Sequence, residues 1–540
     1  MTGADIMVKC LQEEGVKDIF GYPGVAIAPF YNSIYDSDIN SILVRTEQSS
    51  AHAASGYARA NNNKRPGVCA VTSGPGATNL ITGIATAFAD SIPLICITGQ
   101  VNSELLGSDV FQEADITGAC ESFVKYSYLV KDVNDLPRVF KEAFHVATTG
   151  RKGPVLIDVP IDIQQETVKS FKYPASVEMR TYKPTVKGNI VQIKKVIKEL
   201  EKAKRPIICA GGGVLLSAGK GELLDFAEQH NIPVVTTMMG IGVIPTDHRL
   251  CYGMVGNNGK AYANRAMNES DLLIVVGARV ADRAVSQPDL ITRDKVMVHI
   301  DVDPAEIGKN AGPTIPLVGD CRAIFKELGT IEFDSDYSDW LSALDSYRDS
   351  MARKRNPNPK YVDPAAFIGT LSNMMKNDAI YIADVGQNQI WSCDNVNVRE
   401  GKFMTTGGMG TMGYSIPAAI GAKKSRPERQ VVAVCGDGAF QMSMCELATA
   451  RQHGIPIKVV VLTNGYLGMV REYQHFTYDD KYSIVELTGN PDLEKLSAAY
   501  DIPFVRVNNM SEAKSGIEKF LKDDSSFIME AIIDPMDIVR

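Results

Sequence analysis

The sequence of 540 residues has few features of the kind that cross-link a chain. Its ten cysteines are scattered, with no Cys-x-x-Cys pair and no Cys/His cluster at zinc-ligand spacing. A disulfide framework and a structural zinc site are therefore not expected. Reduced thiols are typical of the cytosol, so we expect a cytoplasmic protein.

Long apolar runs and an excess of basic residues are also lacking. No apolar segment approaches the ~20 residues that span a bilayer, and the N-terminal MTGADIMVKCLQEEGV is amphipathic rather than signal-like. The formal net charge of -8 argues against a general binder of nucleic acid or of acidic membranes. We expect no nucleic-acid partner and no membrane.

Short apolar segments that end in glycine-rich loops recur instead, each followed by a helical pattern. They include DIFGYPG, GVCAVTSGPG, PLICITGQ, PIICAGGG, DLLIVVGAR, AIYIADVGQ and VVAVCGDG. Apolar strands that alternate with helices indicate parallel sheets covered on both faces. Two aperiodic stretches, 171–190 and 353–364, are interpreted as linkers. The sequence predicts an α/β fold of three doubly wound parallel-sheet domains.

Residues 68–99 and 431–465 follow one plan, which indicates an internal repeat. Each has an apolar strand, a G-x-G loop, a helix of similar length, an Ile-Pro pair and a second apolar strand. The repeat predicts that the first and third domains are related. Chance similarity between two strand–helix–strand units is the alternative.

Asp437 lies between two glycines at the end of an apolar strand. A tight turn with a solvated aspartate is one interpretation. A metal site is the other, because Asn464 follows Gly438 after 25 residues that read as one helix and one strand. Both loops would then lie at the carboxyl ends of parallel strands, where Mg²⁺ takes a few protein oxygens beside phosphate and water. Gly436 and Gly438 would let backbone N–H groups approach a diphosphate.

This spacing resembles the signature of thiamine diphosphate enzymes, and the resemblance extends over nearly the whole chain. The sequence is similar to the catalytic subunits of the flavin-containing acetohydroxyacid synthase (acetolactate synthase) family. The matching stretches are FGYPG, EQ with HAASGYARA, TSGPGATNL, FQEADI, GPVLIDVP, GGG, TTMMGIG, GARVADR, IDVDPAEI, DVGQNQIW, GGMGTMGYSIPAAIGA, the GDG unit and LGMVREYQ.

The resemblance assigns a role to each domain. It implies a pyrimidine-binding N-terminal domain with the catalytic glutamate at 1–170, a central FAD-binding-like domain at 188–335, and a C-terminal domain at 360–540 that binds diphosphate and magnesium. The first and third domains would share the thiamine diphosphate-binding fold.

Catalytic residues are carried over position by position. Glu47 matches the glutamate that contacts the aminopyrimidine ring, although a glutamate at a strand end is otherwise a solvated cap. Met412 matches the methionine beneath the thiazolium ring, although a loop methionine is otherwise core filler. Phe111 and Gln112 resemble side chains that line the reacting carbon. Arg279 resembles the arginine that binds the acceptor carboxylate.

Cofactor ligands follow in the same way, by resemblance. The expected Mg²⁺ ligands are Asp437, Asn464 and the carbonyl of Tyr466. The residues expected to bind thiamine diphosphate are Pro23, Thr72, Pro75, Asn79, Gly386, Gln387, Gly410, Met412, Gly436, Gly438 and Leu467. Those expected to hold FAD are Gly211, Gly212, Gly213, Thr237, Met238, Gly277, Arg279, Asp301 and Asp320. The GGG segment is equally compatible with a close approach of helix to sheet, and no clean dinucleotide fingerprint indicates a dehydrogenase.

The implied reaction is decarboxylation of pyruvate and transfer of the two-carbon unit to a second 2-keto acid, pyruvate or 2-ketobutyrate, in branched-chain amino acid biosynthesis. The family places Glu47 and Asp437 of one site on neighbouring subunits. The resemblance therefore implies a homodimer or tetramer with shared active sites, and a small regulatory subunit is a further candidate partner.

The sequence departs from the family pattern near the expected substrate channel. The departures are Val25, Thr46, Ile161, Asn257, Asn258, Asn388 and Tyr473, together with an end at DPMDIVR that lacks the family's PPG segment. Tyrosine for tryptophan at 473 changes an apolar wall, and such differences are worth ~1–3 kcal/mol. Altered preference for 2-ketobutyrate is expected, rather than its loss.

Three alternatives stay open from the sequence. A paralogous decarboxylase or carboligase with a different acceptor would keep the thiamine cofactor. A non-catalytic homologue would have lost Glu47 or the metal ligands. A flavin oxidase would carry a membrane-binding tail or a distinct flavin environment, and the C-terminus shows no basic amphipathic helix. Gln112 and Arg279 favour a carboxylate acceptor.

Overall fold

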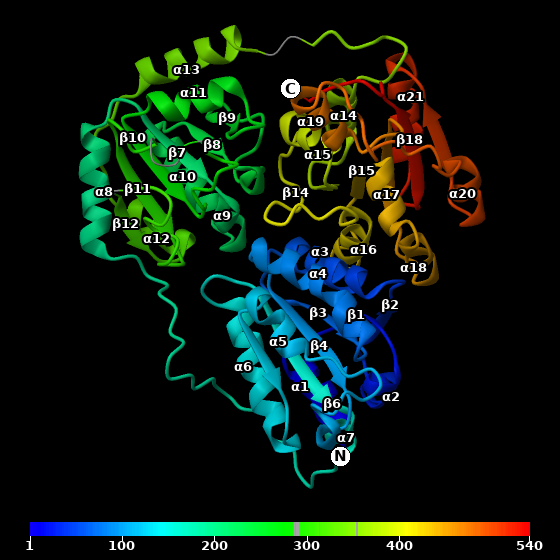
Figure 1. Ribbon diagram of the computed structural model, residues 1–540. Helices are drawn as coiled ribbons and strands as arrows, with labels where there is room; N and C mark the ends of the chain where they lie inside the picture. Colours follow the sequence, from blue (N-terminus) through cyan, green and yellow to red (C-terminus); the bar gives the residue numbers. More distant parts are fainter. Residues whose placement is uncertain (286, 288–290, 313, 353–354, 540) are drawn as a thin grey trace.

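The computed structural model describes residues 1–285, 287, 291–312, 314–352 and 355–539, which form three lobes (Figure 1). Each lobe is built around one six-stranded sheet, and all strand pairs within the sheets are parallel. The α/β fold of three doubly wound parallel sheets is confirmed. The sheets fall inside the three predicted ranges, whose boundaries and roles stay predictions.

The first sheet has the order β2-β1-β3-β4-β6-β5. Its strands are β1 (Asp18–Tyr22), β2 (Asn40–Leu43), β3 (Gly67–Val71), β4 (Leu94–Gln100), β5 (Tyr126–Leu129) and β6 (Pro154–Pro160). Its helices are α1 (Gly3–Glu13), α2 (Ala28–Tyr35), α3 (Glu47–Ala60), α4 (Pro75–Ala89), α5 (Ile116–Cys120), α6 (Leu136–Thr148) and α7 (Ile161–Gln165), with short 3-10 turns η1 (Val25–Ile27), η2 (Ser103–Leu105), η3 (Glu121–Phe123) and η4 (Val133–Asp135).

The third sheet, β14-β13-β15-β16-β18-β17, has the same order when its strands are numbered within the domain. Its strands are β13 (Ile380–Ala383), β14 (Lys402–Met404), β15 (Val431–Gly436), β16 (Lys458–Thr463), β17 (Phe504–Val507) and β18 (Phe527–Ile532). Its helices are α14 (Pro364–Met374), α15 (Gln387–Asn395), α16 (Ser415–Ser425), α17 (Asp437–Ser443), α18 (Glu446–Gln452), α19 (Gly468–Thr477), α20 (Leu493–Ala499) and α21 (Met510–Leu521). The shared order is what the internal repeat predicts.

The middle sheet has the order β12-β11-β10-β7-β8-β9. Its strands are β7 (Pro206–Ala210), β8 (Val234–Thr236), β9 (Cys251–Met254), β10 (Leu272–Val276), β11 (Val296–Asp301) and β12 (Ile315–Val318). Its helices are α8 (Ile190–Lys202), α9 (Gly212–Leu216), α10 (Lys220–His230), α11 (Ala261–Glu269), α12 (Cys321–Leu328) and α13 (Ser338–Ser350), with one 3-10 turn, η5 (Met238–Gly240). Strand order reverses between β7 and β10, a point where open α/β sheets bind ligands.

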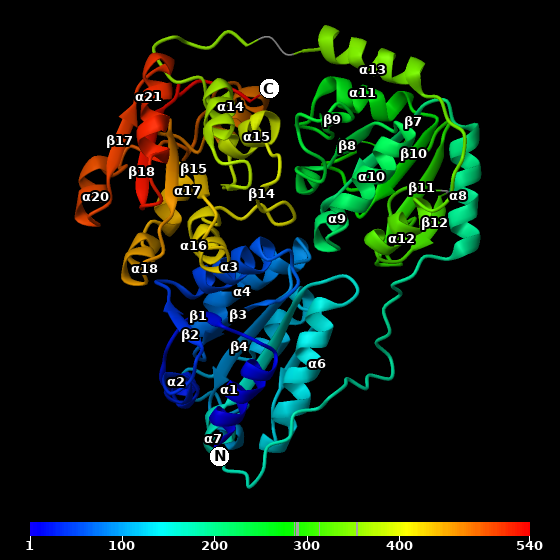
Figure 2. The same cartoon turned by 180° about the vertical axis from the view of Figure 1, so that it is seen from behind.

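Two local predictions need comment. The helix expected after the GDG loop is broken into α17 and α18, with a turn at Met444 and Cys445, and this break points the second helix at the N-terminal domain. The first predicted linker is an extended segment between α7 and α8 (Figure 2). In the second predicted linker, residues 353 and 354 lie outside the described residues.

The two outer domains are joined by α3 and α16, which lie side by side in both views (Figures 1 and 2). A Cβ on Gly56 would lie 2.0 Å from the carbonyl oxygen of Ala418, and one on Gly421 would lie 1.8 Å from that of Ala53. The helix backbones therefore touch, and apolar residues of both domains form one continuous core. Among the described residues, no helix is both long and apolar enough to cross a membrane.

This contact predicts a sharp difference between two glycine substitutions. Gly421→Ala places a methyl group against the α3 backbone, so the thermal unfolding midpoint should fall, with a cost of about 1–3 kcal/mol for overpacking. The matched control is Gly369→Ala inside α14, where the new Cβ meets its nearest atom at 3.8 Å. That control should keep or slightly raise the midpoint. Equal shifts in differential scanning calorimetry would contradict the packing account.

Candidate functional site

Glu47 is the first residue of α3, directly after its N-cap Thr46. The Asn79 amide donates a hydrogen bond to Glu47 Oε2 at 3.0 Å. Gly76 lies beside the same carboxylate, and a Cβ there would be 3.5 Å from Glu47 Oε1 and 2.8 Å from Thr72 Cγ2. Gly24 also packs on Thr72: a Cβ on Gly24 would lie 2.6 Å from the Thr72 side chain. Glu47, Thr72 and Asn79, predicted from distant motifs, therefore lie together.

The approach to Glu47 is fixed by a carboxylate from the third domain. Glu446, the first residue of α18, is fully buried. Its Oε1 accepts the backbone N–H of Arg45 at 3.0 Å and of Thr46 at 3.2 Å, while Thr449 donates its hydroxyl to Oε2 at 2.7 Å. The sequence analysis missed Glu446, because a lone glutamate at a helix start has no local signature of a partner 400 residues away.

Other predicted residues of the N-terminal domain lie in the loops that follow the carboxyl ends of its strands. Pro23 and Pro75 are exposed, and Phe111 is 87% exposed. Gln112 has a φ of 61°, and the Cβ that Gly74 lacks would lie 2.9 Å from the Gln112 Cβ. Gln112 thus packs on the loop that leads to Pro75, while the Phe111 ring has few neighbours of its own chain.

The expected metal ligands meet at the carboxyl ends of two adjacent strands, β15 and β16. Asp437 Oδ2 accepts the backbone N–H of Gly465 and the Asn490 amide, each at 2.8 Å. Asn464 Oδ1 accepts the backbone N–H of Tyr466 at 3.0 Å. Burial raises the pKa of the Asp437 carboxyl above its usual value.

The donor set at this point suits Mg²⁺ and not a soft metal. Carboxylate and amide oxygens are what a hard cation prefers, with few protein ligands when phosphate and water complete the shell. Among the residues that the structure describes, no cluster of three or more His, Cys, Asp or Glu side chains could hold a metal elsewhere. Gly436 fits a diphosphate, because its would-be Cβ meets no protein atom closer than 3.8 Å and protein packing does not explain the glycine. The helix that follows has only seven residues, so its dipole contributes less than the sequence suggests.

Met412 and Leu467 converge on the other glycine of this loop. A Cβ on Gly438 would lie 2.8 Å from Leu467 Cδ2 and 3.7 Å from Met412 Cε. Gly410, with a φ of 63°, has no protein atom near its would-be Cβ. These predicted cofactor residues are therefore neighbours, and space is left above Gly410.

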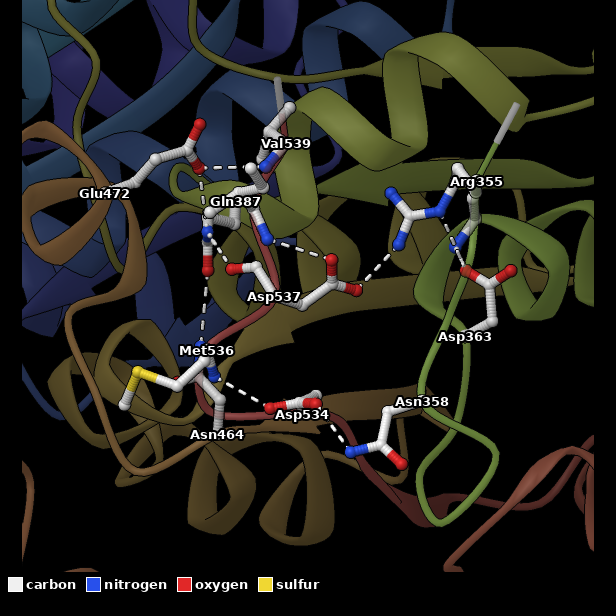
Figure 3. A network of polar contacts seen from close by, with 12 residues as sticks. Arg355, Asn358, Asp363, Gln387, Asn464, Glu472, Asp534, Met536, Asp537 and Val539 are labelled. Carbon is white, nitrogen blue, oxygen red and sulfur yellow. Dashed lines mark hydrogen bonds and ion pairs between the residues drawn. The ribbon is translucent and has the colours of Figure 1, made fainter. Parts of the chain in front are cut away.

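Gln387 is held by its own chain (Figure 3). Its amide group donates to Glu472 Oε2 at 2.9 Å and to the Asp537 carbonyl at 3.0 Å, and its oxygen accepts from the Asn464 amide at 3.3 Å. Gly386, with a φ of 136°, starts α15 without a side-chain cap. The side-chain donors of Gln387 are thus committed within the protein, and the first backbone N–H groups of α15 are the donors that a helix N-terminus offers to an anion.

Two buried carboxylates hold the ends of the loop that carries Gly410 and Met412. Asp90, from the end of α4, accepts the N–H of Gly408 at 2.8 Å and of Gly407 at 3.2 Å. Asp384, after β13, accepts the N–H groups of Gly413 at 2.9 Å and Ser415 at 2.8 Å. Burial raises the pKa of both carboxyl groups, against the lowering effect of these N–H donors. Both were missed: Asp90 stands in none of the matching stretches, and Asp384 opens DVGQNQIW, in which only Gly386 and Gln387 were singled out.

The loop that carries Gly410 and Met412 contacts the end of α3 that is far from Glu47. Arg59, near the end of α3, donates to the Thr405 carbonyl at 2.7 Å and to the Tyr414 hydroxyl at 3.2 Å. The cofactor loop thus meets the C-terminal end of α3, whereas Glu47 begins that helix. Twelve residues of helix separate the two ends by about 18 Å.

The predicted flavin residues line one cleft of about 910 Å³ between the middle domain and both outer domains. All of them except Gly211 are in its wall, namely Gly212, Gly213, Thr237, Met238, Gly277, Arg279, Asp301 and Asp320. Arg151 also lines it and pairs with Asp303 at 3.1 Å and Glu306 at 2.8 Å.

Several of these residues have structural partners of their own. Would-be Cβ atoms on Gly211 and Gly213 would meet the Gly277 backbone at 2.4 Å and 2.6 Å, so the close-approach interpretation of GGG accounts for two of its glycines. Asp320 caps α12 by accepting the Ala323 N–H at 3.1 Å. Burial raises the pKa of Asp301 to about 6. A cleft of this volume is of the size that cofactors occupy.

The family-divergent positions are spread over these sites. Val25 and Tyr473 are 77% and 59% exposed, Thr46 caps α3, and Ile161 begins α7. Asn388 is buried and donates to the Asp384 carbonyl at 2.9 Å. Asn258 lines the cleft and Asn257 precedes it.

Three family models match the chain in order. They are thiamine pyrophosphate enzyme, N-terminal TPP binding domain, over residues 1–119; its central domain, over 193–328; and its C-terminal TPP binding domain, over 384–531. Thiamine pyrophosphate is the cofactor called thiamine diphosphate above.

Curated relatives match over almost the full length. The chain is 41% identical to a probable acetolactate synthase large subunit of Methanocaldococcus jannaschii over 99% of this chain and 93% of the relative. It is 41% identical to the acetolactate synthase large subunit of Corynebacterium glutamicum over 96% and 84%, and 38% identical to that of Haemophilus influenzae over 96% and 92%. The chain therefore belongs to the acetolactate synthase large-subunit family of thiamine pyrophosphate enzymes.

Proposed function

We propose that this chain is a thiamine diphosphate-dependent carboligase, which decarboxylates pyruvate and transfers the two-carbon unit to pyruvate or 2-ketobutyrate. The observation that carries the proposal is the pairing of Asp437 and Asn464 at adjacent strand ends, beside the loop of Met412. This pairing supplies hard oxygen ligands where a diphosphate can reach backbone N–H groups. We further propose that the acetolactate serves branched-chain amino acid biosynthesis and that the protein acts in the cytoplasm.

The residues have the following roles in the proposal. Asp437, Asn464 and the Tyr466 carbonyl hold Mg²⁺, and Gly436 and Gly438 give the diphosphate access to the backbone. Pro23, Thr72, Pro75, Asn79, Gly386, Gln387, Gly410 and Leu467 complete the thiamine diphosphate site. When bound, the cofactor supplies an electron sink for the cleaved carbon–carbon bond.

The chain's own groups do the rest. Glu47 holds a proton at its carboxylate, oriented by the Asn79 amide at 3.0 Å, and exchanges it with the pyrimidine ring as a general acid–base. Phe111 and Gln112 exclude water and orient the keto acid. The Arg279 guanidinium, whose planar donors match a carboxylate, binds the acceptor.

The domain roles follow the same division. Residues 1–170 contribute Glu47, 188–335 hold FAD, and 360–540 hold Mg²⁺ and the diphosphate. The cleft lined by eight of the predicted flavin residues supports the FAD assignment.

Assembly as a homodimer, or a tetramer of two dimers, is part of the proposal. The cofactor loop contacts Arg59, about 18 Å along α3 from Glu47, and this separation supports a site that the Glu47 of a second copy completes. Exposed apolar side chains on both outer domains, among them Val25, Phe111, Met409 and Tyr473, suit such a contact. A small regulatory subunit is proposed as a further partner, since relatives are named large subunits.

The activity is tested by product analysis. With pyruvate, thiamine diphosphate, Mg²⁺ and FAD, NMR should detect acetolactate, and added 2-ketobutyrate should yield the mixed product. Acetaldehyde alone, from protein shown to have bound the cofactor, would contradict the carboligase and indicate a decarboxylase.

Glu47→Gln should lower kcat about 10²- to 10⁴-fold, the usual range for loss of a general acid–base. Binding of thiamine diphosphate, followed by fluorescence quenching, should change little, because the amide keeps the hydrogen-bond partner of Asn79. Glu121→Gln, on the exposed turn η3, is the matched control and should retain full activity. A Glu47→Gln enzyme with near-normal kcat would remove Glu47 from the mechanism.

Asp437→Asn should weaken binding of thiamine diphosphate with Mg²⁺ by at least about tenfold, since the variant lacks the charged metal ligand. Raising Mg²⁺ should restore part of the binding, measured by calorimetry. Asp36→Asn, on an exposed turn after α2, changes the same charge away from the site. If both variants bind the cofactor equally, Asp437 is no metal ligand.

A further inference from the structure

The C-terminal end of α3 is surrounded by cations from all three domains. Lys402, on β14, donates from Nζ to the Arg59 carbonyl at 3.0 Å and to the Asn62 side chain. Arg426, after α16, donates from Nε to the Ala60 carbonyl at 3.3 Å. Successive residues of one helix end thus bind cations from the third domain.

Further cations complete this group, which we call the junction cluster. Lys152 of the first domain donates to the Asn63 carbonyl and, across the domain boundary, to the Leu216 carbonyl, each at 2.8 Å. Lys220, at the start of α10, donates to the Arg399 carbonyl at 3.0 Å. The junction cluster consists of Arg59, Lys152, Lys220, Lys402, Arg426 and Arg429, and all six line the large cleft.

These charges are not balanced by close carboxylates. Within the described part of the chain, Arg59, Lys152, Lys220, Lys402 and Arg426 form no ion pair, while Arg429 reaches Asp378 only at 3.8 Å. Their partners are carbonyl, amide and hydroxyl oxygens. The cations stabilise a helix C-terminus, but this function leaves their charge uncompensated in a protein whose net charge is -8.

The cations of the cluster repel one another. Burial first, and then the charges of neighbouring cations, together lower the pKa of Lys402 to about 7; those neighbours are Arg429, Arg59, Arg426 and Lys220. Three acidic groups act on the cluster: Glu400 on Lys220, Asp90 on Arg59, and Asp320, one of the predicted flavin residues, on Lys152. The junction cluster is a patch of positive charge in a cleft whose wall also carries carboxylates, and such a patch attracts anions.

Donors remain available for such an ion. The Arg426 guanidinium uses only Nε, and Lys220 uses one of its three N–H bonds. Donors of this kind, with guanidinium groups among them, match phosphate oxygens.

From this geometry we infer that the junction cluster is a binding site for a phosphorylated small molecule with two or more linked phosphate groups. None of the residues predicted for FAD or thiamine diphosphate belongs to the cluster, so this is a separate site within the cleft. The ligand would bridge the three domains through Lys152, Lys220 and Arg426. The inference stands independently of the proposed carboligase activity.

Binding should be coupled to proton uptake. A bound polyanion offsets the repulsion on Lys402 and raises its pKa, so Lys402 takes up a proton when the anion binds near neutral pH. The Lys402 contribution to affinity is then full below pH about 7 and declines as the pH rises above it. Pyrophosphate itself becomes more charged as the pH rises over the same range. The contribution of Lys402 is therefore the difference in pH dependence of affinity between wild type and Lys402→Met.

The experiment is isothermal titration calorimetry with inorganic pyrophosphate. The protein is the holoenzyme saturated with thiamine diphosphate and FAD, with free Mg²⁺ kept constant and in excess. We expect one site per chain whose dissociation constant rises about tenfold in Lys402→Met and in Arg426→Gln. In two buffers of different ionisation enthalpy, wild type should take up more protons at pH 7 than Lys402→Met.

Two variants and a control keep the test decisive. Arg426→Gln retains a donor for the Ala60 carbonyl, so this variant should keep the helix end capped. It therefore tests the site even if Lys402→Met folds poorly. Lys198→Met, exposed on α8, removes the same charge elsewhere and should bind as wild type does. Equal affinity in all variants, or no binding at 0.15 M salt, would overturn the site. The same titration is repeated on FAD-free protein. If pyrophosphate binds only in the absence of FAD, these cations belong to the flavin site and the inference is overturned as well.

Discussion

The contact between α3 and α16 is the constraint on which the arrangement of the outer domains depends. Carbonyl oxygens of Ala53 and Ala418 occupy the space that a side chain on Gly421 or Gly56 would need, so the two helices cannot separate or rotate without losing the shared core. Both ends of α3 are then used. Glu446 holds the backbone that leads into Glu47, while Lys402 and Arg426 bind the carbonyls at the other end.

Buried carboxylates do most of the positioning around the expected cofactor site. Asp90, Asp384 and Glu446 each accept backbone N–H groups of a loop or helix end. Removing a carboxylate from water is costly, and two or more N–H donors offset part of that cost. Two of the three interactions cross a domain boundary. The geometry of the cofactor loop therefore depends on the correct docking of domains as well as on local sequence.

The strands and their parallel pairing could be predicted from the sequence. A strand that is buried on both faces of a parallel sheet is a continuous apolar run, and this pattern is visible within a few residues. The GDG loop and Asn464 could be paired for the same reason, since adjacent strand ends must meet. Glu446 and Asp90 could not be found, because their partners lie 400 and 318 residues away and nothing in the local sequence of either carboxylate indicates such a partner. The GGG segment shows the opposite limit: Gly211 and Gly213 satisfy a packing need at Gly277 that a motif cannot distinguish from ligand binding. The break between α17 and α18 precedes Glu446, whose carboxylate contacts the first domain, and hydrophobic periodicity does not encode such a contact.

The first and third domains, which share one strand order, differ at the carboxyl ends of their strands. In the third domain the chain end folds back over these strand ends: the Asp537 carbonyl accepts from Gln387 and from Arg471, and Arg355 pairs with the Asp537 carboxylate at 2.6 Å (Figure 3). In the first domain the corresponding strand ends carry Glu47 and the exposed Phe111, with no such segment over them among the described residues. One set of strand ends is thus organised to hold charged groups by its own chain, and the other presents a glutamate and an aromatic ring outward. Related domains that differ in this way, one with its strand ends covered and one with them open, present unlike surfaces, and this difference supports the proposed assembly from two copies of the chain.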